Sequence, residues 1–97
     1  MWFVYFLLLT NNEIYVGSSN NVARRLIEHN NKLVVSTAKF LPAKLLSYIC
    51  VPTKSKAIQL EKYFKSGSGK SILKKRIIDV NFFVKDGLPS EAYAVKA

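Results

Sequence analysis

Residues 2–17 read WFVYFLLLTNNEIYVG, and they predict the first unit of the fold. Trp2 to Leu9 is a continuous apolar run rich in aromatic side chains, which is typical of a strand covered on both faces. The polar sequence TNNE that follows is a turn signal, and Glu13 to Gly17 has the pattern of a second, short strand. We therefore expect these residues to form a β-hairpin.

Further along the chain, helix and strand signals alternate. Asn20 or Asn21 can cap a helix that runs to about Asn30, because an asparagine side chain accepts a hydrogen bond from the free N–H groups of a first helical turn. The connection that follows is irregular, with a short extended stretch at Leu33–Val35, and Lys44–Val51 is a third strand.

After the third strand the sequence is helical again. We expect a helix over residues 54–65, then an interruption at residues 66–69 with Gly67 as the left-handed residue that ends the helix. A basic third helix is expected over residues 70 to about 77.

The resulting order is strand-strand-helix-strand-helix-helix. It predicts an α+β fold in which helices flank a small, mainly antiparallel three-stranded sheet. A single domain over residues 1–78 accounts for this pattern. We expect residues 79–97 to be a C-terminal extension that is packed at its start and loose at its end.

Composition and charge limit the partners of the chain. Its 97 residues suffice for one domain, and 49% of them are hydrophobic, which allows a modest core. The net charge of +9 favours a polyanion as partner, with nucleic acid ahead of an acidic membrane surface. The first apolar run is too short to span a bilayer, and it lacks the basic region and cleavage site of a signal peptide.

Cys50 is the single cysteine of the chain, which excludes an intramolecular disulfide and a four-cysteine zinc site. We therefore expect a reducing, intracellular compartment, cytoplasm or nucleus, rather than secretion. The side chain of Cys50 is expected to be a small buried hydrophobe in its strand.

Glu61 is an acid at the border of an apolar helix face. At about 100° per residue, the apolar side chains of residues 57–64 gather on one arc, and Glu61 falls at its edge. It is the only acid in residues 54–76, which hold eight Lys or Arg. A carboxylate at the edge of a core loses solvation unless it has a partner. The alternatives are a salt bridge to a nearby lysine and a metal ligand beside a phosphate site.

The first helix separates its polar residues by face. Arg25 and His29 border its apolar arc, whereas Arg24 and Glu28 lie roughly opposite, where a solvated ion pair is expected. Arg25 can reach over the sheet and suits bidentate phosphate binding, with a snorkelling surface arginine as the alternative. His29 fits a general base, a phosphate donor or a boundary histidine with satisfied hydrogen bonds.

Taken together, the residues resemble the GIY-YIG nuclease family, in particular its small stand-alone branch. Tyr5 is the tyrosine of Val4-Tyr5-Phe6, which stands where the first triplet belongs, and Tyr15-Val16-Gly17 closely matches the second triplet. Arg25 follows Tyr15 by ten residues, and His29 follows by another four. Glu61 lies in a helix that matches the one carrying the family's metal-binding glutamate. The resemblance covers residues 2–78, approximately.

Three positions depart from the pattern of the family. The first triplet keeps only its tyrosine, and Ser18 stands where some repair-nuclease relatives have a lysine. The asparagine that some members place near the site has no clear counterpart, Asn81 being a weak candidate.

The resemblance implies a metal-dependent endonuclease that hydrolyses phosphodiester bonds in DNA, which is favoured over RNA, with structured or damaged DNA as a candidate substrate. Glu61 would hold one Mg²⁺ or Mn²⁺ ion, and Tyr15 would take a proton from the attacking water, assisted by Tyr5 or His29. Arg25 would stabilise charge on the phosphate. No small-molecule cofactor and no membrane are implied. The nucleic-acid backbone would contact the basic side chains of Arg24, Lys65, Lys70, Lys74, Lys75 and Arg76.

The same resemblance constrains the hairpin, because both tyrosine hydroxyls must lie on one face of the sheet. A two-residue loop at Asn11-Asn12 would pair Tyr15 with Leu8 and place Tyr5 on the opposite face. We therefore predict a connection with an odd number of residues, or a bulge, between residues 9 and 14. Tyr5, Tyr15, Arg25 and Glu61 would then converge on one shallow cleft.

Two other functions fit the sequence. One is a nucleic-acid-binding module that kept the fold and lost turnover, and the other is an interaction protein whose charge is incidental. Metal-dependent nicking distinguishes a nuclease from the binding module. Salt-sensitive binding to nucleic acid distinguishes the nuclease and the binding module from the interaction protein.

Overall fold

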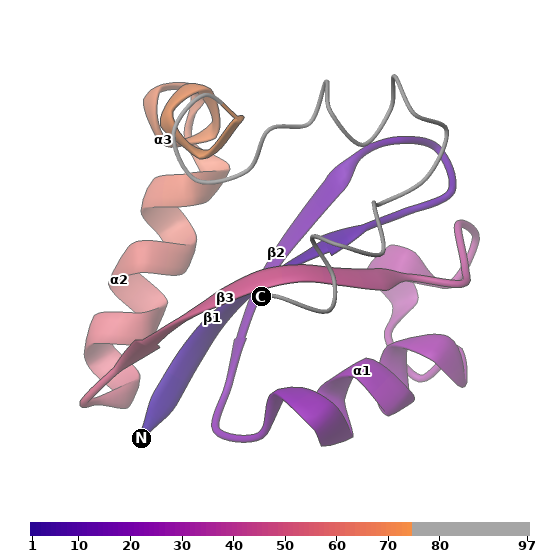
Figure 1. Cartoon of the computed structure of the whole chain (residues 1–97), viewed down its shortest axis with the longest axis horizontal. Helices are drawn as coiled ribbons and strands as arrows, with labels where there is room; N and C mark the ends of the chain where they lie inside the picture. Colours follow the sequence, from indigo (N-terminus) through magenta and orange to yellow (C-terminus); the bar gives the residue numbers. More distant parts are fainter. Residues whose placement is uncertain (75–97) are drawn as a thin grey trace, which may run out of the picture.

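The computed structural model describes residues 1–74. Its strands form one antiparallel sheet in the order β2-β1-β3. The helices confirm the predicted order and the α+β fold class (Figure 1). The elements are β1 (Trp2–Leu8), β2 (Ile14–Ser19), α1 (Val22–Asn30), the 3₁₀ turn η1 (Val35–Thr37), β3 (Lys44–Val51), α2 (Lys54–Lys65) and α3 (Gly67–Ile72).

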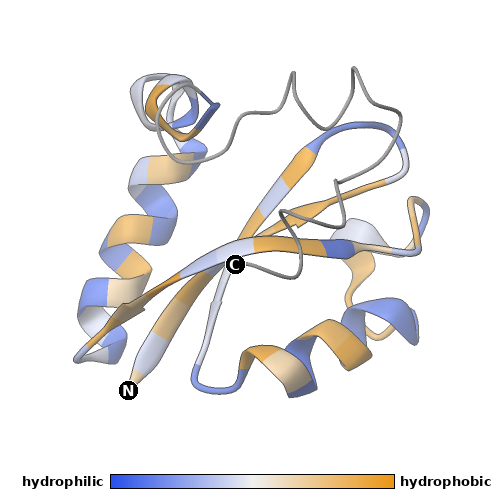
Figure 2. Cartoon of the chain, in the orientation of Figure 1, coloured by the Kyte–Doolittle hydropathy of each residue, from blue (hydrophilic) through white to orange (hydrophobic). Residues whose placement is uncertain are grey.

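The sheet lies between α1 and α2, and the central strand β1 is buried on both faces (Figure 1). Val4 and Phe6 point to the α2 face, whereas Tyr5 and Leu7 point to the α1 face. Side chains alternate along a strand, so the continuous apolar sequence of β1 supplies both cores. Figure 2 shows the matching pattern on α1 and α2, where hydrophobic and hydrophilic residues alternate along each helix.

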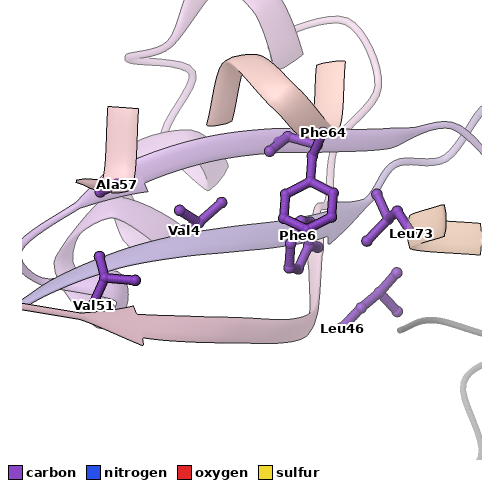
Figure 3. Close-up of a cluster of buried hydrophobic side chains, with 8 residues drawn as sticks. Val4, Phe6, Leu46, Val51, Ala57, Phe64 and Leu73 are labelled. Carbon is purple, nitrogen blue, oxygen red and sulfur yellow. The ribbon is translucent and has the colours of Figure 1, made fainter. Parts of the chain in front are cut away.

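The core on the α2 face anchors the helix that carries Glu61. Phe64 of α2 packs edge-to-face on Phe6 of β1, with ring centroids 5.3 Å apart at 90° (Figure 3). Burial of each such side chain stabilises the fold by roughly 1.5–3 kcal/mol. The cluster comprises Val4, Phe6, Val16, Leu46, Val51, Ala57, Phe64 and Leu73.

The hairpin between β1 and β2 has a three-residue loop, Thr10 to Asn12. The N–H of Leu9 donates to the carbonyl of Glu13 at 2.9 Å, and the N–H of Asn12 donates back to the carbonyl of Leu9 at 3.0 Å. Asn12 has a φ of 65°, a left-handed conformation that asparagine tolerates better than most residues. The predicted odd-numbered connection is confirmed.

This loop sets the register that the tyrosines require. Tyr15 pairs with Leu7, and Tyr5 pairs with Gly17. Directly opposed residues of neighbouring strands share a face, so Tyr5 and Tyr15 lie on the same side of the sheet. That side is the one covered by α1.

Four local predictions were wrong. Val35 belongs to the 3₁₀ turn η1 and not to an extended stretch. The third helix begins at Gly67 and not at Lys70, because Ser66 caps it by accepting a hydrogen bond from the N–H of Gly69. Gly67 therefore starts a helix and does not end one in the left-handed conformation. Cys50 is exposed, because it lies on the edge strand β3 while the apolar residues of α1 pack chiefly around β1.

Some expectations lie outside the described residues. These are the domain boundary at residue 78, the end of the third helix, the C-terminal extension, and the side chains of Lys75, Arg76 and Asn81. Within residues 1–74, no helix combines the length and apolar character needed to cross a membrane.

Candidate active site

Tyr5 lies at the centre of the α1 face, where it is 1% exposed. Its ring centroid is 6.3 Å from that of Tyr15, which is partly exposed on the edge strand β2. Gly17, the residue opposite Tyr5, has no side chain to interfere, and a methyl group there would overlap the Tyr5 hydroxyl. The glycine of the second triplet is thus required by the tyrosine of the first.

Replacing Gly17 with alanine tests this packing directly. We expect Gly17→Ala to destabilise the fold by about 1–3 kcal/mol, since the new methyl group forces Tyr5 out of its position. Gly67→Ala is the matched control, because its methyl group would have no atom within 4 Å. That variant should be as stable as the wild type or up to about 1 kcal/mol more stable. Urea unfolding measures both, and equal stabilities of the two variants would contradict the close approach.

His29 is fully buried beneath the tyrosines. Its Nε2 lies 2.9 Å from the Tyr5 hydroxyl, and its Nδ1 lies 2.7 Å from Oγ1 of Thr37, which is also fully buried. Burial lowers the pKa of His29, and the charge of Arg25 lowers it further, so the imidazole is neutral. Of the three interpretations open from the sequence, this geometry matches a histidine whose hydrogen bonds are satisfied.

The two tyrosines differ in their access to solvent and so in the chemistry open to them. Burial raises the pKa of Tyr5 to about 12, although the neighbouring Arg25 acts in the opposite direction. The Tyr5 phenol therefore keeps its proton at neutral pH. Tyr15 is only partly buried and lies against His29, with ring centroids 5.1 Å apart. Tyr15 is thus the more accessible of the two hydroxyls.

Arg25 and Arg24 are separated as the helix periodicity predicts. The side chain of Arg25 is 36% exposed and that of Arg24 is 56% exposed. Both pair with Glu28, Arg25 at 2.9 Å and Arg24 at 3.7 Å, so the carboxylate is shared rather than paired with Arg24 alone. A hydrogen bond to Glu28 raises the pKa of Arg25, and its proximity to Tyr5 adds to the shift. Only Arg25 combines this pairing with a position beside the tyrosine.

Glu61 lies on α2, next to the edge of β2, with its side chain 24% exposed. Ser18 donates a hydrogen bond to Oε1 at 2.6 Å, and the Lys65 ammonium contacts Oε2 at 2.8 Å. Partial burial by itself would raise the pKa of Glu61, but the bonds from Lys65 and Ser18 outweigh it and hold the pKa below its usual value. Glu61 is therefore a carboxylate at neutral pH.

Lys65 connects the two halves of the site. Besides contacting Glu61, its Nζ lies 5.6 Å from the centroid of the Tyr15 ring, in a cation–π arrangement. Tyr15 faces α1 and Ser18 faces α2, so Lys65 spans the exposed edge of β2. Lys65, which the sequence predicted to contact the nucleic-acid backbone, thus lies between Glu61 and Tyr15. Arg24, Lys70 and Lys74 are exposed outside it.

Of the four residues predicted to converge, Tyr5, Tyr15 and Arg25 lie on the side of α1 and Glu61 lies on α2. Tyr5, Tyr15 and His29 are in mutual contact, and Glu61 joins Tyr15 through Lys65. A groove of about 420 Å³ lies instead between the start of α1 and β3, over Phe3 and Tyr48, and none of the candidate site residues lines it. In residues 1–74, no three His, Cys, Asp or Glu side chains gather into a metal-binding group.

Two residues of the site were not predicted from the sequence. Ser18 looked like a departure from the family pattern, yet its hydroxyl orients Glu61 across 43 positions of sequence. Thr37 lies in an irregular connection, and nothing in its local sequence shows that it meets His29. The one available signal for Ser18 was its place directly after the second triplet.

The candidate site thus combines a buried phenol–imidazole pair, an adjacent partly exposed tyrosine and arginine, and a single carboxylate on the neighbouring helix. Residues 1–76 match the GIY-YIG catalytic domain, so this chain belongs to the GIY-YIG family. That family is one of nucleases, which act on nucleic acid and generally depend on a divalent metal.

The chain is similar to several UPF0213 proteins. It is 38% identical over 78 residues to one from Bacillus licheniformis, an alignment that covers 79% of this chain and 78% of that protein. It is 34% identical over 61 residues to one from Cupriavidus pinatubonensis, covering 62% of this chain and 68% of that protein. The solution NMR structure of a UPF0213 protein from Bacillus halodurans matches with 28% identity and a TM-score of 0.47, over 75% of this chain and 82% of that one.

Proposed function

We propose that the protein is a metal-dependent endonuclease that hydrolyses phosphodiester bonds in DNA. The observation that carries this proposal is the position of Lys65, which contacts both the Glu61 carboxylate and the ring of Tyr15. A carboxylate, a base candidate and cations are thereby joined at one exposed strand edge, where a backbone phosphate can approach. The buried Tyr5–His29 pair lies next to Tyr15 on the α1 face of the sheet.

The donor set at Glu61 suits a hard cation. Mg²⁺ and Mn²⁺ prefer oxygen ligands, and Mg²⁺ keeps several waters, so one carboxylate and a substrate phosphate can hold it. Glu61 is ionised and partly exposed, as such a ligand must be. Ser18 would orient one carboxylate oxygen, while Lys65 competes with the ion for the other. When bound, the ion supplies Lewis-acid stabilisation of charge on the phosphate.

Tyr15 is the residue we assign to accept a proton from the attacking water. Tyr15 is partly exposed at the edge of the sheet, and the Lys65 ammonium lies 5.6 Å from the centroid of its ring. Arg25 would donate to the phosphate oxygens, which requires its guanidinium to turn from Glu28 toward the substrate.

Tyr5 and His29 have a different assignment, because both are buried. Tyr5 keeps its proton and His29 is neutral and inaccessible, so neither removes a proton from bulk water. They hold the ring of Tyr15 and the guanidinium of Arg25 in place. The exposed cations Arg24, Lys70 and Lys74 would contact the phosphate backbone and contribute affinity without reading sequence.

Incubation with a panel of labelled nucleic acids tests the proposal. The panel should include plain, nicked and branched DNA duplexes and the corresponding RNAs, each with Mg²⁺, Mn²⁺ or EDTA. We expect cleavage of DNA with either metal and none with EDTA. Salt-sensitive binding without any cleavage would instead assign the chain as a non-catalytic binding module. If the chain neither binds nor cleaves any member of the panel, its positive charge is incidental to its function.

A further inference from the structure

A chain of buried polar groups extends from the site into the irregular connection before β3. It begins at the Tyr5 hydroxyl, passes through both ring nitrogens of His29 and ends at the Thr37 hydroxyl, which lies 3.5 Å from the carbonyl of Val34. His29 and Thr37 are both completely buried. Buried polar groups destabilise a fold unless their hydrogen bonds are satisfied, so each proton in this chain must have a definite place.

The neighbours of the Tyr5 hydroxyl indicate where these protons lie. Its hydrogen-bond partner within residues 1–74 is Nε2 of His29, and its other polar neighbour, Arg25, carries only donors. The phenol proton therefore needs Nε2 as its acceptor. A neutral imidazole with an unprotonated Nε2 carries its proton on Nδ1. That Nδ1–H can only donate to Oγ1 of Thr37, 2.7 Å away.

Thr37 continues this chain of hydrogen bonds, with each group donating to the next. Because its oxygen accepts from His29, its own proton is free to donate to the carbonyl of Val34, the residue three positions earlier. The 3₁₀ turn η1 brings this carbonyl and the hydroxyl together, since Val34 caps the turn and Thr37 ends it. All the donors then point from Tyr5 toward the interior or, at the last link, onto the backbone.

We propose that Thr37 is a positioning residue: by accepting the hydrogen bond from Nδ1–H it stabilises this tautomer of His29, and it thereby keeps Nε2 free to accept the hydrogen bond from the Tyr5 hydroxyl. With its proton committed to His29, the Tyr5 oxygen presents its lone pairs to the site, where they hold Arg25. In the opposite tautomer, Nε2–H would donate to the Tyr5 oxygen. The phenol proton would then turn toward Arg25, whose guanidinium cannot accept a hydrogen bond. The consequence for catalysis rests on the proposed nuclease function, whereas the tautomer itself does not.

NMR can read this tautomer without any activity, because His29 is the only histidine of the chain. Long-range ¹H–¹⁵N correlation of the imidazole in the wild-type protein should show a protonated Nδ1 and an unprotonated Nε2. Thr37→Ser keeps the hydroxyl and should keep that pattern. Thr37→Val matches threonine in shape but lacks the hydroxyl, so it should move the proton to Nε2 or give a mixture of tautomers.

Cleavage assays then separate the two proposals. If the protein is a nuclease, Thr37→Val should lower turnover by about tenfold, the scale of losing an outer hydrogen-bond partner, and Thr37→Ser should restore most of it. A wild-type spectrum with a protonated Nε2, or an unchanged tautomer in Thr37→Val, overturns the assignment of Thr37. A wild-type protein with the expected tautomer that cuts no nucleic acid refutes the nuclease function and leaves the assignment of Thr37 standing. The wild-type spectrum decides the tautomer of His29 even if Thr37→Val does not fold, and a protonated Nε2 there would overturn the proposal.

Discussion

Glu61→Gln should abolish cleavage while leaving the fold and nucleic-acid binding close to those of the wild type. Glutamine has the same shape, and its carbonyl oxygen can still accept the hydrogen bond from Ser18 that Glu61 accepts at 2.6 Å. It has no negative charge, so it cannot hold a divalent cation as a carboxylate does. The measurements are turnover with Mg²⁺ or Mn²⁺, thermal unfolding, and DNA binding in EDTA.

Two further variants give this result its meaning. Glu13→Gln removes the same charge from an exposed loop position and should cut at the wild-type rate. Ser18→Ala keeps the carboxylate but frees one of its oxygens, so we expect Mn²⁺ affinity to weaken by about tenfold, as for other residues that orient metal ligands. Undiminished Mg²⁺-dependent cutting by a pure Glu61→Gln preparation would remove Glu61 from the site and leave the carboxylate as the partner of Lys65.

Arg25→Ala should lower turnover by roughly 10²-fold or more, which is the scale of losing one donor to charge that develops in a transition state. Arg25 borders the buried face of α1 and lies beside Tyr5, so its guanidinium is the one that can reach a phosphate over the tyrosines. Single-turnover kinetics at saturating DNA isolate this step from binding.

Arg24→Ala is the matched control for Arg25→Ala. Arg24 is the adjacent residue, has the same charge and also pairs with Glu28, but its side chain is the more exposed of the two. We expect Arg24→Ala to weaken binding slightly in a salt-dependent manner and to leave saturated turnover unchanged. Equal losses of turnover in the two variants would show that the two faces of α1 are not distinguished by the chemistry.

Local sequence patterns were sufficient for the elements and for most candidate residues. The apolar run of β1, the cap at Asn21, and the bounds of β3 and α2 follow from short-range rules that operate within a few residues. The odd number of residues in the hairpin loop could also be predicted. Side chains alternate along a strand, so Tyr15 has only two possible faces, and only one of them is that of Tyr5. The helical period likewise separated Arg25 from Arg24.

The local rules failed at Cys50 and at the start of α3. Cys50 was expected to be buried because its strand is apolar, but β3 is an edge strand and α1 packs elsewhere. The start of α3 at Gly67 follows from the cap at Ser66, and Gly69 lies so close to the backbone of Tyr63 that a methyl group would overlap it. The apolar pattern of β3 does not show that it is an edge strand, and helix propensity does not show the close approach at Gly69.

By itself, the sequence determined the fold class, the order of elements, the family and the residue types of the site, because periodicity, capping and motif spacing act along the chain. Only the tertiary structure decided the roles of those residues, because burial and hydrogen-bond partners depend on what is brought alongside. Ser18 meets Glu61 across 43 positions and Tyr5 meets His29 across 24. Because of these contacts, Ser18 is a hydrogen-bond partner of the Glu61 carboxylate, and His29 is a buried, neutral partner of Tyr5 rather than an accessible base.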